Sequence, residues 1–145
     1  MQLTRFSDFA LRVLMYAHAA DDRLVTIEEM AAAYRISRTH LMKVVNALSR
    51  AGYLKAVRGR VGGVTLARPA EAIRLGDVVR ATEPDFALVE CFSCDNECII
   101  HGCCRLPAVL RHALAAFLSE LDRHTLASIA PKPREFRRVL NIEER

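Results

Sequence analysis

The sequence predicts a mainly α-helical chain with one small β-hairpin, arranged as a winged helix-turn-helix followed by a long C-terminal helix. Three observations support this expectation. Apolar residues recur at helical spacing in three segments before residue 52. Two short alternating segments then flank a glycine-rich turn, and a second helical stripe follows the last cysteine. The 145 residues suffice to bury one core, but not two independent ones.

Three helices are expected ahead of the hairpin. The first covers residues 8–19, where apolar side chains recur every three or four positions. The second begins at Thr26, because Thr26-Ile-Glu-Glu29 matches a capping box, and it ends at Tyr34. The third begins after Ser37, which can cap it, and ends before Gly52, a residue suited to a left-handed cap.

The second and third helices predict a helix-turn-helix, whose second helix enters the major groove with its N-terminal residues at the base edges. A forked guanidinium, hydroxyls and an imidazole, which suit base contacts, lie at the start of the third helix: Ser37, Arg38, Thr39, His40 and Lys43. Thr26 and Arg50, at the outer ends of the helix pair, complete the helical candidates. A three-helix core with a solvated polar face would give the same pattern, so the hairpin is the more specific feature.

Residues 53–57 and 64–67 predict two strands, and Arg58-Gly-Arg-Val-Gly-Gly63 between them predicts a wing. The glycines allow a tight turn and a close approach of the backbone to another surface. Candidate contacts to phosphates or the minor groove are Arg58, Arg60 and Gly62. Residues 31–70 contain eight Lys or Arg and no Asp or Glu, which favours nucleic acid as the partner over an ordinary hairpin with solvated arginines.

The remaining chain predicts a connecting helix over residues 73–82 and, after Cys104, a long helix through Ala127. The apolar stripe of the long helix is expected to pack on its own domain and on a twofold partner. These expectations divide the chain into a winged helix-turn-helix DNA-binding domain (1–83), a cysteine loop (84–104), a dimerisation helix (105–130) and a mobile tail (131–145).

All five cysteines lie in the short segment Cys91–Cys104, and their concentration indicates metal or redox chemistry. Soft thiolates select iron–sulfur clusters, zinc or Cu(I). A zinc site could use Cys91 and Cys94 with Cys98 and Cys104, and a disulfide switch among these thiols is a further alternative. A coincidental group of small apolar residues is the purely structural interpretation. The adjacent Cys103 and Cys104 cannot easily face one metal together.

Several motifs occur here in an order that is typical of one family. They are Met1-Gln-Leu-Thr-Arg-Phe-Ser-Asp8, Ser37-Arg-Thr-His-Leu41, Leu48-Ser-Arg-Ala-Gly52, Val57-Arg-Gly-Arg-Val-Gly-Gly63, Ile73-Arg-Leu-Gly-Asp-Val-Val-Arg80, Glu83-Pro84 and Cys104-Arg-Leu106. With these motifs the chain resembles the small winged-helix iron–sulfur regulators of bacteria, and most closely their nitric-oxide-sensing branch of repressors, NsrR. The resemblance extends from Met1 to about residue 130.

The resemblance implies a homodimer that binds double-stranded operator DNA of twofold symmetry and responds to nitric oxide. It also implies an iron–sulfur cluster held by Cys91, Cys98 and Cys104, with [4Fe-4S] favoured over [2Fe-2S]. Such a cluster needs a further ligand, and the nitric-oxide branch implies Asp8 of the partner subunit in that role. A carboxylate favoured by the helix dipole is the alternative explanation of Asp8.

Other branches and other classes of protein are alternatives. The cluster-biogenesis branch, IscR, uses a histidine just after the third cysteine, where this sequence has Pro107, and the iron-responsive branch, RirA, also fits. A zinc-bound DNA-binding module and an oxidoreductase using Cys91-Phe-Ser-Cys94 are the other candidates, but no enzyme is expected. Cys94 and Cys103 match no required family cysteine. The sequence has no membrane-spanning apolar run or signal-peptide core, so we expect a cytoplasmic protein with no membrane partner.

Overall fold

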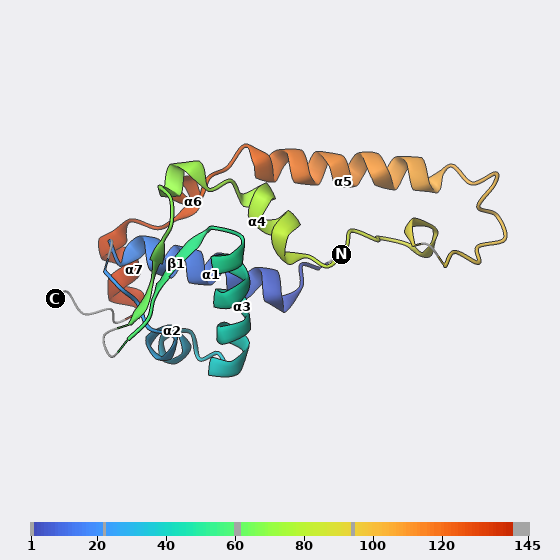
Figure 1. Ribbon diagram of the computed structural model, residues 1–145. Coiled ribbons are helices and arrows are strands. Elements are labelled where there is room, and N and C mark those ends of the chain that lie inside the picture. The colour runs from blue at the N-terminus through green and yellow to red at the C-terminus, as the bar shows by residue number, and fades with distance from the viewer. Residues whose placement is uncertain (1, 22, 60–61, 94, 141–145) are drawn as a thin grey trace.

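The computed structural model describes residues 2–21, 23–59, 62–93 and 95–140, and it consists of a body and a projecting arm (Figure 1). The body core is built from the following elements: α1 (Arg5–Ala19), α2 (Ile27–Tyr34), α3 (Arg38–Arg50), β1 (Leu54–Val57), β2 (Gly63–Leu66), the 3-10 turn η1 (Ala70–Ala72) and α4 (Leu75–Thr82). The predicted fold class, mainly helical with one antiparallel hairpin in a winged helix-turn-helix, is confirmed.

The first helix, α1, is the central element of the body. It begins at Arg5 rather than at residue 8, because Thr4 is its N-cap and accepts a hydrogen bond from the Ser7 amide at 3.2 Å. The helix buries the stripe expected from its spacing, including Val13 and Leu14, which have no exposed surface. α3 and α4 both contact α1, so the helix-turn-helix and the connecting helix share one core.

Each helix of the helix-turn-helix is followed by a residue in the left-handed conformation. Arg35 follows α2 with a φ of 54°, and Gly52 follows α3 with a φ of 75°. At the end of α3 the Tyr53 amide donates to the Leu48 carbonyl at 2.9 Å, which is the long hydrogen bond of a Schellman motif. The left-handed cap predicted at Gly52 is therefore confirmed.

The hairpin pairs β1 with β2 in antiparallel register, with Leu54 opposite Leu66. A third segment joins it, because Val25 and Val64 form an isolated bridge with hydrogen bonds of 2.9 and 2.8 Å. Gly63 allows this approach, since a Cβ at that position would lie 2.8 Å from the Val25 carbonyl oxygen. The bridge fastens the base of the wing to the loop before α2.

The helix after the cysteine loop is shorter than predicted. α5 (Leu106–Asp122) ends at Asp122, whereas the apolar stripe predicted a helix through Ala127. Thr125 instead caps a separate short helix, α6 (Leu126–Ile129), with a reciprocal capping box. Leu126 is fully buried in the body core, so the chain turns back into the body at this point.

The C-terminal segment also differs from the expectation of a mobile tail over residues 131–145. Residues 133–140 form a helix, α7 (Pro133–Leu140), which contacts α1. Arg137 Nε donates to the Ala19 carbonyl at 2.8 Å, and Leu140 packs against the core. Residues 141–145 lie outside the described part of the chain.

The arm consists of residues 84–104 and the N-terminal part of α5 (Figure 1). Within α5 only Pro107 is buried, whereas Leu106 and Val109 are 53% and 61% exposed. The C-terminal part of α5 packs on α4 and attaches the arm to the body. In the described chain, no helix combines the length and the apolar character that crossing a membrane requires.

Candidate nucleic-acid interface and cysteine loop

The helix α3 has one buried face and one exposed polar face. Its apolar stripe from Leu41 to Leu48 is buried and fixes the helix on the body core. The opposite face exposes the base-contact candidates: Ser37, Arg38, Thr39, His40, Lys43 and Arg50. A rigid helix therefore presents a forked cation, hydroxyls and an imidazole to solvent, which are the groups that base edges and phosphates accept.

The two predicted cap residues behave differently. Thr26 caps α2, because its hydroxyl accepts a hydrogen bond from the Glu29 amide at 3.1 Å. Ser37 occupies the N-cap position of α3, but its side chain makes no capping hydrogen bond there. Both residues are exposed, and only the Ser37 hydroxyl is free of a capping bond. Their roles as DNA contacts stay predictions.

Two exposed residues of α3 extend this face and were missed from the sequence. Met42 is 44% exposed, and Asn46 is exposed one turn further along. Met42 lies three residues after Thr39, and Asn46 lies three residues after Lys43 and four before Arg50, which places them on the same side of the helix. This spacing was visible in the sequence, but our candidates concentrated on the first helical turn.

Arg38 is held by an acidic residue of the preceding helix. Its Nε lies 2.7 Å from Oε1 of Glu28 on α2, while the two side chains remain 70% and 60% exposed. The ion pair thus crosses the helix-turn-helix at its solvent-facing edge. Sequence spacing could not indicate this pair, because the left-handed turn at Arg35 brings the two residues together.

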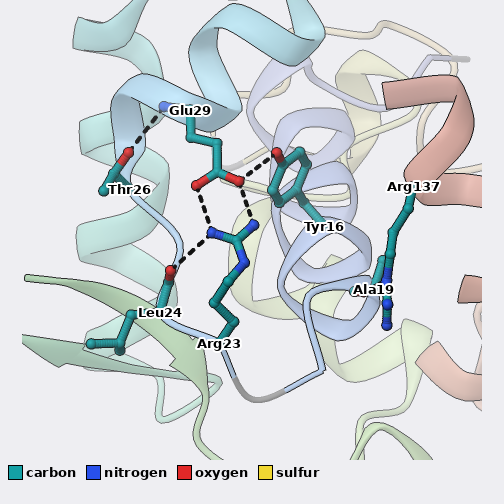
Figure 2. Close-up of polar contacts among 7 residues, drawn as sticks. All are labelled: Tyr16, Ala19, Arg23, Leu24, Thr26, Glu29 and Arg137. Carbon is teal, nitrogen blue, oxygen red and sulfur yellow. Dashed lines mark hydrogen bonds and ion pairs between the residues drawn. The ribbon is translucent and has the colours of Figure 1, made fainter. Parts of the chain in front are cut away.

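The second carboxylate of α2, Glu29, points inward and connects α2 to α1 (Figure 2). It accepts a hydrogen bond from the Tyr16 hydroxyl at 2.9 Å and two from the guanidinium of Arg23. Burial raises the pKa of Glu29, but the bonds from Arg23 and Tyr16 outweigh it, and the net pKa lies below its ordinary value. Burial and the bond to Glu29 raise the pKa of Tyr16. The network therefore keeps a charged carboxylate and a neutral phenol inside the body.

The wing is described on both sides of its tip. Arg58 is exposed, Gly62 is half-buried, and Arg60 lies outside the described residues. A Cβ at Gly62 would lie 2.6 Å from the Val57 carbonyl oxygen, so only glycine fits at this point of the turn. The hairpin's own backbone therefore requires glycine here, whereas the predicted close approach of the wing to another surface, DNA in particular, stays a prediction.

A basic residue outside our candidates connects the wing to α3. Arg68, two residues beyond β2, donates from Nε to the Gly52 carbonyl at 3.1 Å and from Nη2 to the Ala51 carbonyl at 3.2 Å. Its guanidinium also lies over the Tyr53 ring, 4.6 Å from the centroid. Arg68 thus binds the carbonyl end of α3 and fixes this helix relative to the wing.

The cysteine loop contains four described thiols, all of them free. Cys91, Cys98 and Cys104 are half-buried, and Cys103 is exposed, whereas Cys94 lies outside the described residues. Hydrogen bonds from the described residues 85–104 connect the loop with itself, as in the 3.1 Å bond from the Cys98 amide to the Asn96 side chain. The loop touches α5 where the Phe92 ring lies under the guanidinium of Arg111.

The predicted metal ligands are not gathered in the described part of this single chain, where no three His, Cys, Asp or Glu side chains form a group that could hold a metal ion. Asp8 lies on α1 and is paired with Arg12, with its oxygens 3.0 and 2.8 Å from Nε and Nη2. The ligand set of Cys91, Cys98, Cys104 and Asp8 therefore stays a prediction.

The start of the cysteine loop is fastened to the first turn of α1. The Glu83 carboxylate accepts hydrogen bonds from the amide and the hydroxyl of Thr4, at 2.9 and 3.0 Å. The hydroxyls of Ser7 and Thr82 are both buried and lie 2.8 Å apart. These contacts place the entry of the loop beside the helical turn that carries Asp8.

Comparison with known proteins gives a family match and a structural match. The family described as "Rrf2: Iron-dependent Transcriptional regulator" matches residues 3–132. A putative transcriptional regulator from Listeria innocua superposes with a TM-score of 0.68 at 27% identity, covering 89% of this chain and 85% of that chain.

Two further solved structures are similar in fold at lower identity. CymR, the global cysteine regulator of B. subtilis, has a TM-score of 0.68 at 24% identity and covers 90% of this chain and 96% of its own. IscR of T. potens has a TM-score of 0.69 at 23% identity, with coverages of 89% and 85%. The arrangement of body and arm is thus shared with known regulators over nearly the whole chain.

Proposed function

We propose that this chain, which belongs to the Rrf2 family of transcriptional regulators, is a homodimeric DNA-binding repressor whose iron–sulfur cluster senses nitric oxide. The observation that best supports DNA binding is the exposed polar face of α3, which lies within an acid-free stretch of the sequence. Genes of nitrosative-stress defence are the targets that the nitric-oxide role implies.

DNA recognition would use α3 and the wing together. The first turns of α3 would enter the major groove, and Arg58 and Arg60 of the wing would reach the backbone or the minor groove. Arg68 supports this geometry, because it fixes the end of α3 against the wing. Lys43 and Arg50 would contact phosphates, so binding should weaken steeply with salt.

The arm supports a homodimer. Leu106 and Val109 of α5 are more than half exposed, as are Ile99 and Ile100 at the end of the loop. Such a run of apolar side chains on a projecting helix favours burial against a second copy. A twofold dimer would present two copies of α3 to the two halves of a symmetric operator.

The chemistry of the donor set fits an iron–sulfur cluster. Cys91, Cys98 and Cys104 are free, half-buried thiols in one loop whose hydrogen bonds are internal, so the loop can adapt to a cluster without breaking the body. The family description as iron-dependent supports iron over zinc. When bound, a cluster, [4Fe-4S] in our proposal, would supply iron that reacts with nitric oxide. Asp8 of the partner would have to leave Arg12 to act as the fourth ligand.

The contacts around Glu83 support a connection between the loop and the body. Thr4, Ser7, Thr82 and Glu83 join the entry of the cysteine loop to α1, and α1 packs against α3. A structural change in the cysteine loop would therefore be transmitted to α3 through the packing contacts of α1.

The direct test compares operator binding by anaerobically purified protein, by metal-free protein and by protein treated with nitric oxide, in mobility-shift titrations. We expect high affinity only for the untreated loaded protein, together with a visible absorption that nitric oxide alters. Equal affinity of all three forms would contradict sensing. Colourless protein with stoichiometric zinc would favour the zinc-bound module, and a response to iron supply but not to nitric oxide would favour a RirA-like or IscR-like regulator.

A further inference from the structure

We propose that Glu28 is a positioning residue for base recognition, whose carboxylate fixes the guanidinium of Arg38 so that its terminal nitrogens read one guanine. The inference rests on the proposed DNA-binding function and adds a specificity determinant from α2. The observation that carries it is the contact of 2.7 Å between Glu28 Oε1 and Arg38 Nε.

The geometry leaves the reading edge of Arg38 available. The ion pair engages Nε, the guanidinium nitrogen nearest the backbone, and neither Nη1 nor Nη2 donates a hydrogen bond to another described residue. These two terminal nitrogens can donate in parallel to O6 and N7 of guanine, which is the most common specific contact in the major groove. Arg38 is the first residue of α3, where base contacts are expected.

The negative charge of Glu28 indicates that this residue orients Arg38 and does not itself contact DNA. A carboxylate next to the recognition helix repels DNA phosphates and therefore weakens sequence-independent binding. The side chains are 70% and 60% exposed, and such surface pairs contribute little to folding. What the pair does provide is a restricted Arg38 side chain, which loses less conformational freedom when it binds a base.

Selection of bound sequences from a random duplex pool tests the proposal. The samples are the full-length chain and its variants Arg38→Ala, Glu28→Ala and Glu28→Gln. Arg38→Ala identifies the guanine that Arg38 reads, because preference at that position should vanish. Glu28→Ala should lower preference at the same position by about 2- to 10-fold and leave other positions unchanged. Glu28→Gln should lose less, because its amide oxygen can still lie against Nε, although without the negative charge of the carboxylate.

Affinity for random DNA is a second measurement, and a purely structural role of Glu28 would not change it. Both Glu28 variants remove the same negative charge, so both should bind random DNA more tightly and to the same extent. Glu71→Gln is the matched control, because Glu71 is an exposed acid in η1 on another part of the body. It should leave base preference unchanged, and thermal unfolding should confirm that all variants are folded.

The possible results distinguish a failure of the positioning role of Glu28 from a failure of the proposed DNA binding. If the unsubstituted chain enriches a sequence and Glu28→Ala retains full guanine preference at the Arg38 position, the positioning role is wrong while DNA binding stands. An equal loss at every position would also overturn it, because that pattern indicates damage to α2. If the unsubstituted chain enriches no sequence, the proposed DNA function fails and the inference fails with it.

Discussion

At the scale of single residues, the turn between α2 and α3 contains a local strain that favours glycine. Arg35 adopts a φ of 54°, a region in which a Cβ costs about 1–2 kcal/mol. A glycine would remove this cost but would lose about 0.5–1 kcal/mol of chain entropy. The structure thus keeps a basic, exposed residue at a position where glycine would be more stable.

Replacing Arg35 with glycine should therefore stabilise the protein by about 0.5–1 kcal/mol. Urea unfolding monitored by circular dichroism measures this difference. Arg35→Ala is the control, since alanine keeps the Cβ and should bring no comparable gain. If Arg35→Ala stabilises as much as Arg35→Gly, the backbone conformation is not the cause. If Arg35→Gly also weakens DNA binding, the side chain has a functional role that explains its retention.

The Glu29 network makes stability depend on acid pH. The pKa of Glu29 is lowered from its ordinary value of 4.5, so the folded state binds its proton more weakly than the unfolded state does. The stabilisation is fully present above pH 4.5 and is lost as the pH falls through the folded-state pKa. Glu29→Gln should therefore be less stable than the unsubstituted chain at pH 7, and the difference should shrink below pH 4.5.

Unfolding free energies measured by urea titration between pH 7 and pH 3 check this expectation. Tyr16→Phe serves as the control, because it removes one hydrogen bond to Glu29 but leaves the bonds from Arg23. It should give a smaller loss at pH 7 with the same direction of pH dependence. A constant difference between Glu29→Gln and the unsubstituted chain over the whole range would show that the Glu29 charge does not matter.

Which residue roles could be predicted depends on the sequence distance to the partner. Thr26 and Gly52 act through hydrogen bonds within a few residues, and their motifs predicted both caps. The reciprocal half of the capping box predicted at Thr26 is wrong, because the Glu29 carboxylate binds Tyr16 and Arg23 instead. Arg68 acts on carbonyls 16 and 17 residues away, and Glu83 acts on Thr4, 79 residues away. Only the fold brings those partners together, so composition and spacing could not indicate them.

At the scale of elements, periodicity predicted most of the helices and the hairpin, but it misplaced the start of α1 and the end of α5 and did not indicate α7. Leu126 and Ala127 continue the apolar spacing of α5, and this continuity hid the break before them. The signal for a new helix was present in Thr125 and Ser128, which form the capping box of α6. The break matters because it places the attachment of the arm at Asp122, at the end of α5.

The attachment of α5 to α4 is formed by an ion pair over a glycine. Arg80 makes two hydrogen bonds of 2.6 and 2.7 Å to the Asp122 carboxylate, and Gly76 lies directly beneath. A Cβ at Gly76 would meet Asp122 Oδ1 at 1.9 Å, so a methyl group there would displace the carboxylate from Arg80. The ion pair between Arg80 and Asp122 therefore requires a residue without a side chain at position 76.

A double-mutant cycle tests this connection. Gly76→Ala should stabilise the Asp122→Ala variant by up to about 1 kcal/mol, because alanine is the better helix former. The obstructing carboxylate is gone in that variant, and the Arg80 guanidinium, 2.8 Å from the new Cβ, is free to move aside. In the presence of Asp122 most of that gain should disappear, since the new methyl group breaks the pair with Arg80. Thermal or urea unfolding of the four proteins gives the coupling. Equal effects of Gly76→Ala in both backgrounds would contradict the proposed steric link.

At the scale of the whole molecule, burial is distributed unevenly. The body holds the hydrophobic core, including Leu14, Leu41 and the distant Leu126, whereas the described arm buries only Pro107 of α5. The sequence predicted an apolar helix but could not show how little of it the same chain covers. A second copy of the chain packed on α5 would cover its exposed apolar side chains. In our proposal, that copy would also supply its Asp8 to the cysteine loop.

The dimer is testable by one charge at the exposed part of the arm. Val109 is 61% exposed on α5, so Val109→Glu costs little in a single chain but would bury a carboxylate at the proposed interface. We expect Val109→Glu to be monomeric in analytical ultracentrifugation, to keep the thermal transition of the body, and to lose affinity for a twofold operator. Val139→Glu is the matched control, because Val139 is 74% exposed on α7, outside the arm. It should remain dimeric and bind DNA, and a dimeric Val109→Glu would remove α5 from the interface.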